Sequence, residues 1–113
     1  MVLLATAAAL YGPPTALSAP VTWHSATASW YGSELFGNLT ACGQTYGPDL
    51  LGVAHKSFRC GTKIRFLYRG RKVTVRVVDR GPYVAGRTFD LTHATAKRLR
   101  FDGVQTVKWR RGK

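Results

Sequence analysis

Acidic residues are scarce in this chain of 113 residues, which has 5 Asp and Glu against 17 Lys and Arg and a formal net charge of +12. The first 55 residues contain no Lys or Arg and only two acids, Glu34 and Asp49. Residues 56–113 therefore hold all 17 basic residues and three acids, a net charge of +14. Such a charge favours an anionic polymer as partner.

Disorder is excluded by the apolar content. Hydrophobic residues make up 45% of the chain, and three Trp, five Tyr and five Phe are too many for a disordered basic tail. The length predicts one small domain with a packed core.

Cysteine is also rare, and its two copies, Cys42 and Cys60, exclude a scaffold built on many disulfides. Neither belongs to a CxxC pair, so zinc and thioredoxin-type chemistry lack their usual spacing. We expect one disulfide between them, which closes a loop and stabilises the fold by about 3 kcal/mol. Two unpaired buried thiols are the alternative.

Long apolar runs are absent except for Met1–Leu10, which Gly12, Pro13 and Pro14 end well short of a membrane span. We expect residues 1–25 to be a signal-like leader and linker, although no basic residue precedes the run. A disordered leader is the alternative. No Cys lies near a possible cleavage point at Ala19, so a lipid anchor is not expected. The predicted location is secreted, with the folded domain at 26–113.

Regular structure is predicted mainly after residue 60. Lys63–Tyr68 and Lys72–Val77 alternate apolar with charged or polar residues, as half-buried strands do, and Arg69, Gly70 and Arg71 join them as a hairpin. Their basic residues then face outward, and these are Lys63, Arg65, Lys72 and Arg76. Further strands are expected at Ser29–Gly32, Arg87–Leu91 and Val104–Trp109, with a helix capped by Thr92 and ending near Arg100. These elements predict a small, mainly β closed barrel with one helix.

Several short motifs follow one another in a recognisable order. They are Ala28-Ser29-Trp30-Tyr31-Gly32, Thr40-Ala41-Cys42-Gly43-Gln44, Ala54-His55-Lys56 with Gly61-Thr62, Val78-Asp79-Arg80-Gly81-Pro82-Tyr83 and Phe89-Asp90-Leu91-Thr92. Together they resemble the rare lipoprotein A family of septal lytic transglycosylases. This resemblance implies a six-stranded double-psi β-barrel, a fold shared with expansins, over 26–113.

The resemblance also implies an activity, which is cleavage of peptidoglycan glycan strands to 1,6-anhydro-muramyl ends. This reaction needs one acid that donates a proton and later accepts one. Asp79 matches the family's catalytic Asp, and His55 matches a functional His. An Asp in this role needs burial or a nearby negative charge to raise its pKa, and Asp90 is expected to supply that charge. No cofactor and no metal are expected, because His24 and His93 pair with nothing at ligand spacing.

Two departures from the family pattern weaken the catalytic prediction. Gln44 stands where the family has Glu, and it keeps hydrogen bonding but loses the charge. Cys42 and Cys60 are reminiscent of expansins, which loosen walls without hydrolysis and whose required Asp corresponds to Asp90. A non-catalytic wall-binding module is therefore the alternative function.

Each candidate residue also has a purely structural interpretation. Asp79 can cap its own turn or pair with Arg80, His55 can be a partly buried core residue, and Asp90 can bond amides at the start of the Thr92 helix. The predicted substrate-binding residues are Asp90, Gln44, Tyr31, Tyr83 and Arg80. Tyr31 is expected to face a sugar-binding groove, and Trp30, pointing the opposite way, is expected in the core.

The partners follow from these assignments. We expect binding to peptidoglycan glycan strands and to anionic cell-wall polymers by a monomer without a membrane span. Nucleic acid is not expected, because export and a disulfide argue against it and no stacking-aromatic motif of an RNA-binding module is present.

Overall fold

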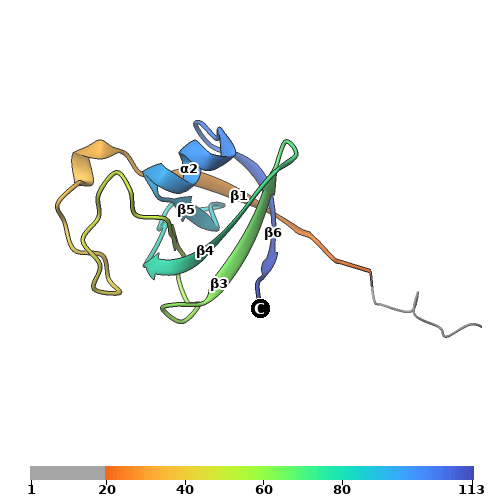
Figure 1. Cartoon of the computed structure of the whole chain (residues 1–113), viewed down its shortest axis with the longest axis horizontal. Coiled ribbons are helices and arrows are strands. Elements are labelled where there is room, and N and C mark those ends of the chain that lie inside the picture. The colour runs from red at the N-terminus through yellow and green to blue at the C-terminus, as the bar shows by residue number, and fades with distance from the viewer. Residues whose placement is uncertain (1–19) are drawn as a thin grey trace, which may run out of the picture.

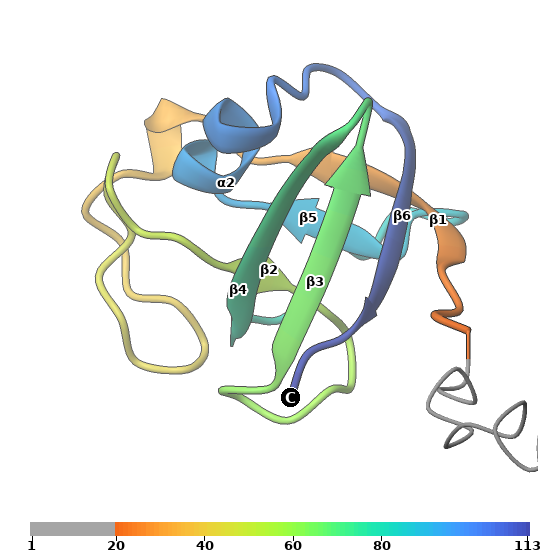
Figure 2. The same cartoon turned by 45° about the vertical axis from the view of Figure 1, so that its right-hand side comes forward.

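The computed structural model of the protein describes residues 20–113, and the predictions for the leader at 1–19 lie outside the described residues. Six strands close into a barrel in the order β1-β5-β2-β4-β3-β6, as Figures 1 and 2 show. The strands are β1 (His24–Trp30), β2 (Val53–Ala54), β3 (Lys63–Tyr68), β4 (Arg71–Asp79), β5 (Phe89–Leu91) and β6 (Gln105–Arg111). One α-helix, α2 (His93–Leu99), and a 3-10 helix, η2 (Ser33–Leu35), complete the described part. The predicted mainly β barrel with one short helix is confirmed.

The β3–β4 hairpin follows the predicted alternation. Ile64 lies opposite Val75 and Phe66 opposite Val73, and all four are buried in the barrel. The two-residue turn at Arg69 and Gly70 has positive φ at both positions, which suits the twist of a tight hairpin. The basic residues that alternate with the core positions point outward, so much of the positive charge lies on one exposed sheet face.

The first strand is longer and begins earlier than the sequence indicated. β1 starts at His24 because residues 24–28 pair antiparallel with β6, from His24 opposite Trp109 to Ala28 opposite Gln105. The Ser, Ala and Thr residues of this segment have little intrinsic strand preference, so the partner strand decides their conformation. His24, expected before the barrel, is therefore part of it.

Helix α2 closes one end of the barrel and is capped as predicted. The Thr92 hydroxyl accepts a hydrogen bond from the Thr95 amide, and Arg100 ends the helix in the left-handed conformation. Both threonines are buried, and their hydroxyls accept from the amide of Gly52 just before β2. These two hydrogen bonds join the helix to the start of β2.

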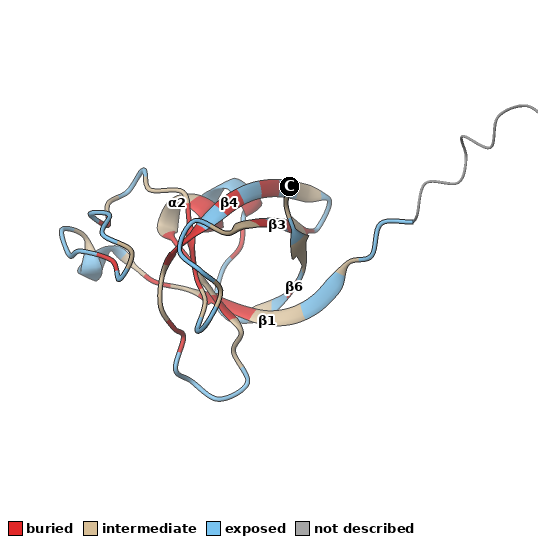
Figure 3. Ribbon diagram, turned by 90° about the horizontal axis from the view of Figure 1, so that it is seen from below, coloured by how far each residue is buried: buried red, intermediate tan, exposed pale blue. Residues whose placement is uncertain are grey.

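Two apolar clusters lie on opposite sides of β2. The main core fills the barrel and includes Val53, Phe66 and Phe89, whereas Tyr31, Tyr46 and Ala54 form a separate, smaller cluster. Figure 3 shows buried residues mainly on the barrel strands and exposed residues mainly on the loops. The long segment between β1 and β2 covers this second cluster and extends from one side of the barrel in Figure 1. Within the described residues no helix is long and apolar enough to cross a membrane.

Candidate active site

Two of the predicted site residues lie in one row across three neighbouring strands. Ala54 on β2 is the register partner of Asp90 on β5 and of Asp79 at the end of β4. Neighbouring strands are about 4.8 Å apart, which puts the two Asp backbones about 10 Å apart with only a methyl side chain between them. The β2–β4 pairing is shifted by one residue between Val53 and Ala54. The two carboxyl groups are nonetheless close, because the charge of Asp79 acts on Asp90 and the charges of both act on the Tyr31 hydroxyl.

Asp90 has a clearly raised pKa. Burial is the largest cause and the negative charge of Asp79 adds to it, while the Ser29 hydroxyl and Arg87 act in the opposite direction, and together these effects bring the pKa to about 6. Ser29 is itself buried and donates to Asp90 Oδ1 at 3.1 Å. Asp90 therefore holds its proton through mildly acidic conditions, as a general acid requires.

Asp79 is held by backbone amides. Its Oδ1 accepts from the amide of Ala41 at 2.8 Å and from the amide of Arg80 at 2.9 Å. It thus caps its own turn, as the structural interpretation predicted, and also fixes the loop that carries Cys42. The other carboxyl oxygen, Oδ2, accepts from neither of these two amides.

The predicted disulfide between Cys42 and Cys60 is present. It joins the loop that contacts Asp79 to the segment leading into β3. The amide of Cys42 also donates to the Val78 carbonyl at 3.2 Å, so this loop is tied to the end of β4 twice. Cysteine pairing therefore supports the geometry around Asp79.

Arg80 does not bind the Asp79 carboxylate through its guanidinium. That group donates instead to the carbonyl oxygens of Phe58 at 2.7 Å and His55 at 3.2 Å. The interpretation of Asp79 as the ion-pair partner of Arg80 is therefore wrong. Arg80 fixes the loop after β2, and its charge is turned away from the two acids.

Tyr31 lies beside the acids but is more buried than a sugar-stacking residue. Its ring packs on Tyr46 with centroids 4.5 Å apart, and only 9% of the residue is exposed. Its buried hydroxyl has no hydrogen-bond partner among the described residues, and burial with the charges of Asp79 and Asp90 raises its pKa. Tyr31 is thus a neutral hydroxyl donor near both acids, and its ring face is not open for stacking.

Tyr46 was not singled out from the sequence. Its hydroxyl donates to the Tyr31 carbonyl at 2.7 Å and accepts from the amide of His93, so it links β1 to the start of α2. One interpretation of the sequence had Asp90 accept from an amide at the start of this helix, but the His93 amide donates to Tyr46 instead. Asp90 is thus left facing Ser29, and its interpretation as a helix-start residue is wrong.

His55 follows Ala54 and lies on the other side of β2. Its ring stacks on Phe58 with centroids 3.7 Å apart and lies 5.3 Å from Phe89 of the core. Its Nδ1 accepts from the amides of Ser57 and Phe58, which leaves the ring proton on Nε2. Burial lowers its pKa, and nearby positive charges lower it further. The backbone links it to the acids, because its amide donates to the Asp79 carbonyl.

We expect His55 to remain neutral at neutral pH and to carry its proton on Nε2. The reason is that two backbone donors occupy Nδ1 while burial and cations disfavour the charged ring. Nitrogen-detected NMR of the imidazole reports both the tautomer and the titration midpoint. A midpoint below the usual 6.5 with an Nε2 proton agrees with the structure, whereas an Nδ1 proton or a raised midpoint contradicts it.

The remaining predicted residues lie at the edge of the site. Gln44 is exposed, and its Oε1 accepts from the Thr40 hydroxyl at 2.9 Å, so its side chain is folded onto its own loop. Tyr83 is 77% exposed after the turn that follows Asp79. Trp30 packs against the barrel core as predicted, and its indole donates to Asp102. Among the described residues no three His, Cys, Asp or Glu side chains gather at metal-binding distance.

Ser29 and Ala54 were missed as site residues. The alternation of β1 offered a signal for Ser29, because a strand that points Trp30 to the core places Ser29 and Tyr31 on the opposite face. Ala54 offered none, since its importance lies in its small size between two acids of distant segments.

Comparison with known proteins identifies the family. The sequence model of the family described as "Lytic transglycolase" matches residues 24–109, from the first residue of β1 into β6. The chain belongs to this family. The residues matched by the lytic transglycolase model include Ser29 and the row of Ala54, Asp79 and Asp90.

Curated relatives agree with this family. The chain is 47% identical over 74 residues to the probable endolytic peptidoglycan transglycosylase RlpA of Aquifex aeolicus, covering 64% of this chain and 33% of the relative. It is 40% identical over 97 residues to the endolytic peptidoglycan transglycosylase RlpA of Pseudomonas aeruginosa strain UCBPP-PA14, covering 74% of this chain and 28% of the relative. The chain thus spans between a quarter and a third of the length of these two relatives.

Solved structures support the lytic transglycolase barrel at the level of fold. Streptomyces papain inhibitor superposes with a TM-score of 0.63 at 22% identity, over 81% of this chain and 96% of that one. A Clavibacter michiganensis expansin mutant in complex with cellohexaose gives the same TM-score at 17% identity, over 81% of this chain and 51% of that one. The double-psi β-barrel expected from the motifs is confirmed.

Proposed function

We propose that this barrel is a peptidoglycan lytic transglycosylase. It cleaves the β-1,4 bond between N-acetylmuramic acid and N-acetylglucosamine and leaves 1,6-anhydro-muramyl ends. The observation that carries the proposal is the row of Asp90, Ala54 and Asp79, in which one carboxyl group has a pKa raised to about 6. The names of the curated relatives support the same reaction.

Asp90 acts as the general acid and then as the general base. Its protonated carboxyl donates to the glycosidic oxygen as the bond from the anomeric carbon to that oxygen breaks. The 6-hydroxyl of the muramic acid residue then attacks the anomeric carbon and gives its proton to the Asp90 carboxylate. The acid is regenerated, no water is consumed, and one carboxyl group serves both steps.

Asp79 supplies negative charge in this mechanism. The sequence motifs assign the general acid and base to Asp79 and the neighbouring negative charge to Asp90. The burial of Asp90 and its raised pKa favour the reverse assignment. The negative charge of Asp79 helps to raise the pKa of Asp90 and would stabilise positive charge at the anomeric carbon. Its two amide contacts hold its side chain at the site.

The other predicted residues position the two acids or contact the sugar. Tyr31 places a buried, neutral hydroxyl beside the two acids, and His55 acts from the other side of β2 through its amide, which donates to the Asp79 carbonyl. Tyr83 is the exposed aromatic ring available for stacking on a sugar. Arg80 supports the loop that carries His55. Action on peptidoglycan requires a location outside the cytoplasm, with which the disulfide agrees.

The proposal is tested by incubating the purified protein with amidase-treated peptidoglycan and analysing the soluble products by mass spectrometry. Anhydro-disaccharide ends are expected. If no such ends appear while the protein still sediments with the wall, the enzyme hypothesis is rejected in favour of the non-catalytic, expansin-like binding module.

We expect Gln44→Glu to change activity by no more than about threefold. The side chain at 44 is exposed and turned onto Thr40, whose hydroxyl donates to a carboxylate as readily as to an amide oxygen. Initial rates of product release measure the effect. A large gain would show that the missing acid limits turnover and that the site geometry described above is incomplete.

A further inference from the structure

A second feature of the barrel is a positively charged surface on the outside of β4, β3 and β6. Core residues of these strands, such as Ile64 and Val107, point into the barrel, so their neighbours along each strand point outward. The register then brings the outward cations together in rows, and Arg65 on β3 lies directly opposite Arg110 on β6. We call this surface the basic face, and its outward cations are Lys63, Arg65, Lys72, Arg76, Lys108 and Arg110.

Acidic residues are absent from the segments that carry the basic face. Residues 61–78 and 103–113 include all of its cations and contain no Asp or Glu. The acids that adjoin these segments make other contacts, because Asp79 accepts from backbone amides of the candidate site and Asp102 accepts from the Trp30 indole. The positive charge of the basic face is therefore available to an external anion.

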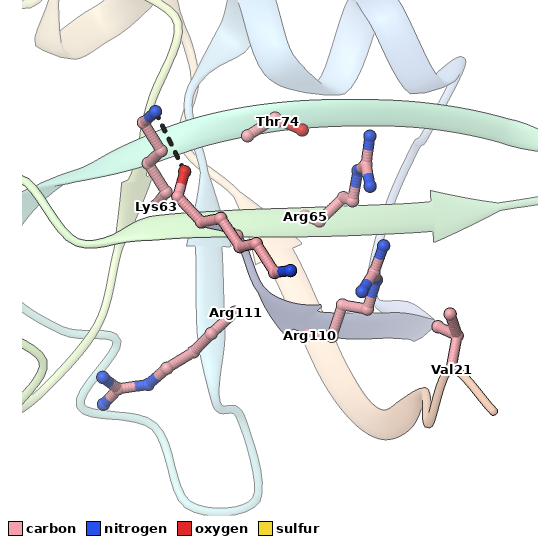
Figure 4. A pocket seen from close by; sticks show the side chains of 8 residues that line it. Val21, Lys63, Arg65, Thr74, Arg110 and Arg111 are labelled. Atoms are coloured by element: carbon pink, nitrogen blue, oxygen red, sulfur yellow. Dashed lines mark hydrogen bonds between the residues drawn. The ribbon is translucent and has the colours of Figure 1, made fainter. Parts of the chain in front are cut away.

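Like charges are direct neighbours within the basic face. Arg65 and Arg110 are cross-strand partners, and Lys63 and Arg76 are a second such pair. Like charges in that position destabilise a sheet. Figure 4 shows the guanidinium groups of Arg65 and Arg110 extending from neighbouring strands into the same space. An anion between two such cations removes the repulsion, so the arrangement favours a bound anion.

The basic face is also hollowed beside β3 and β6. A pocket of about 520 Å³ has Lys63, Arg65 and Arg110 in its lining. The guanidinium carbon of Arg110 lies 5.2 Å from the centroid of the Trp23 ring, and this contact holds the cation against the sheet. Cations two residues apart on one strand are about 6.8 Å apart. A linear ligand that follows the strands therefore meets several cations in succession.

The density of charge on the basic face favours phosphodiesters over the carboxylates of a glycan. A phosphodiester polymer carries one negative charge in every repeating unit. A glycan without stem peptides carries at most one carboxylate on every second sugar. Lys binds phosphate as a point charge, and Arg binds it through two parallel hydrogen bonds. The ligand whose charge matches this face is thus a phosphodiester polymer.

Nucleic acid and membrane lipid fit the basic face less well. Single-stranded nucleic acid binds where its bases stack on aromatic rings, and the described lining of the hollow contains no aromatic residue. One face of the Trp23 ring is occupied by the Arg110 guanidinium. Binding at a membrane surface combines cations with apolar groups that enter the bilayer, and among the described lining residues only Val21 is an exposed large apolar residue.

From these observations we infer that the basic face binds a linear polymer of phosphodiesters, of the kind attached to bacterial cell walls. The inference does not depend on the proposed function, because the face lies on the outer side of β3, β4 and β6 and the row of acids spans β2, β4 and β5. Binding at this face holds the barrel on the wall and leaves the row of Asp90, Ala54 and Asp79 free for glycan.

The test is titration of the full chain into fluorescently labelled poly(glycerol phosphate), followed by anisotropy at several salt concentrations. Polyglutamate, oligothymidylate and phosphatidylglycerol vesicles are the carboxylate, nucleic-acid and membrane controls. Arg65→Gln with Lys108→Gln removes two exposed cations from the basic face. Lys97→Gln with Arg98→Gln removes the same charge from the exposed side of α2. Thermal melts verify that both variants are folded.

We expect wild type to bind poly(glycerol phosphate) more tightly than it binds the three control probes. The logarithm of its affinity should fall against the logarithm of salt concentration with a slope of about 4, because each phosphate contact releases about 0.7 counterion. The face variant should bind about tenfold more weakly, with a slope lower by about 1.4, and the α2 variant should behave as wild type.

Cell walls extend the same comparison to the natural polymer. Hydrofluoric acid removes phosphodiester polymers from a wall and leaves its glycan and stem peptides. This treatment should lower the affinity of wild type for the wall about tenfold and should not affect the face variant. Binding to the treated wall then measures the glycan site alone.

Four results would overturn the inference. Tighter binding to polyglutamate assigns the basic face to carboxylates, tighter binding to oligothymidylate assigns it to nucleic acid, and tighter binding to vesicles assigns it to a membrane. Equal losses in the two variants assign the effect to net charge alone. Poly(glycerol phosphate) contains no glycosidic bond in its backbone, so a barrel without lytic activity still gives the expected binding, and an active enzyme without a polymer site does not.

Discussion

Asp90→Asn is expected to lower the release of anhydro-muramyl products by about 10²–10⁴-fold. Asparagine keeps the size of the side chain and still accepts from the Ser29 hydroxyl, which donates to Asp90 Oδ1 at 3.1 Å. It has no acidic proton to donate and is a poor acceptor for the proton of the 6-hydroxyl. Initial rates on amidase-treated peptidoglycan measure the loss.

The same variant is expected to be more stable than wild type above pH 6. Burial raises the pKa of Asp90 from 3.8 to about 6, so the folded state favours the protonated form. Its contribution to stability is present at low pH and is lost as the pH rises through about 6, where the buried carboxylate becomes charged. Asn stays neutral, and after allowance for partial exposure the gain is about 1–2 kcal/mol at neutral pH. Thermal melts at several pH values measure it.

Asp79→Asn is the matched control for this assignment. It removes charge from the same row but leaves the carboxyl group with the raised pKa. We expect wild-type activity to fall as the pH rises through about 6, and Asp79→Asn to move that fall to lower pH, since the charge of Asp79 helps to raise the Asp90 pKa. Full activity in Asp90→Asn together with complete loss in Asp79→Asn would show that Asp79, and not Asp90, is the general acid and base.

Removal of the disulfide is the second large effect that we expect. Cys42→Ser with Cys60→Ser opens a loop of 18 residues in sequence separation, and the chain-entropy model gives a loss of about 3 kcal/mol. For a domain of this size the loss corresponds to about 15 °C in melting temperature. Activity should fall as well, because the loop of Cys42 carries the Ala41 amide that holds Asp79.

Thermal denaturation with and without reductant measures this effect. Reductant should lower the melting temperature of wild type to that of the double Ser variant and should not affect the variant. A double variant that melts within about 2 °C of wild type would mean that the disulfide adds little to a loop already held by the Cys42 and Ala41 amides.

The hairpin and the helix were predictable because their signals are local. Alternation in Lys63–Tyr68 identifies which side chains are buried, and Thr92 identifies the start of α2. The first strand was not predictable to the same degree. Its Ser, Ala and Thr residues acquire strand structure from β6, which lies about 80 residues away in the chain.

The site was predictable as a list of residues but not as a set of roles. The motifs indicated Asp79 and Asp90, yet the choice between them depends on burial and on Ser29, neither of which is visible in the spacing. Tyr31 was expected to offer its ring, and the packing of Tyr46 leaves only its hydroxyl. Such outcomes depend on contacts between distant segments, which a single sequence does not record.

The origin of the oxygen at the new glycan end tests the central claim most directly. Amidase-treated peptidoglycan is digested in water labelled with heavy oxygen, and the released ends are weighed by mass spectrometry. The account predicts products one water lighter than hydrolysis products and free of label, because the 6-hydroxyl of the sugar is the nucleophile. Reducing ends that carry heavy oxygen would contradict it, since they would identify water as the nucleophile and the barrel as a hydrolase.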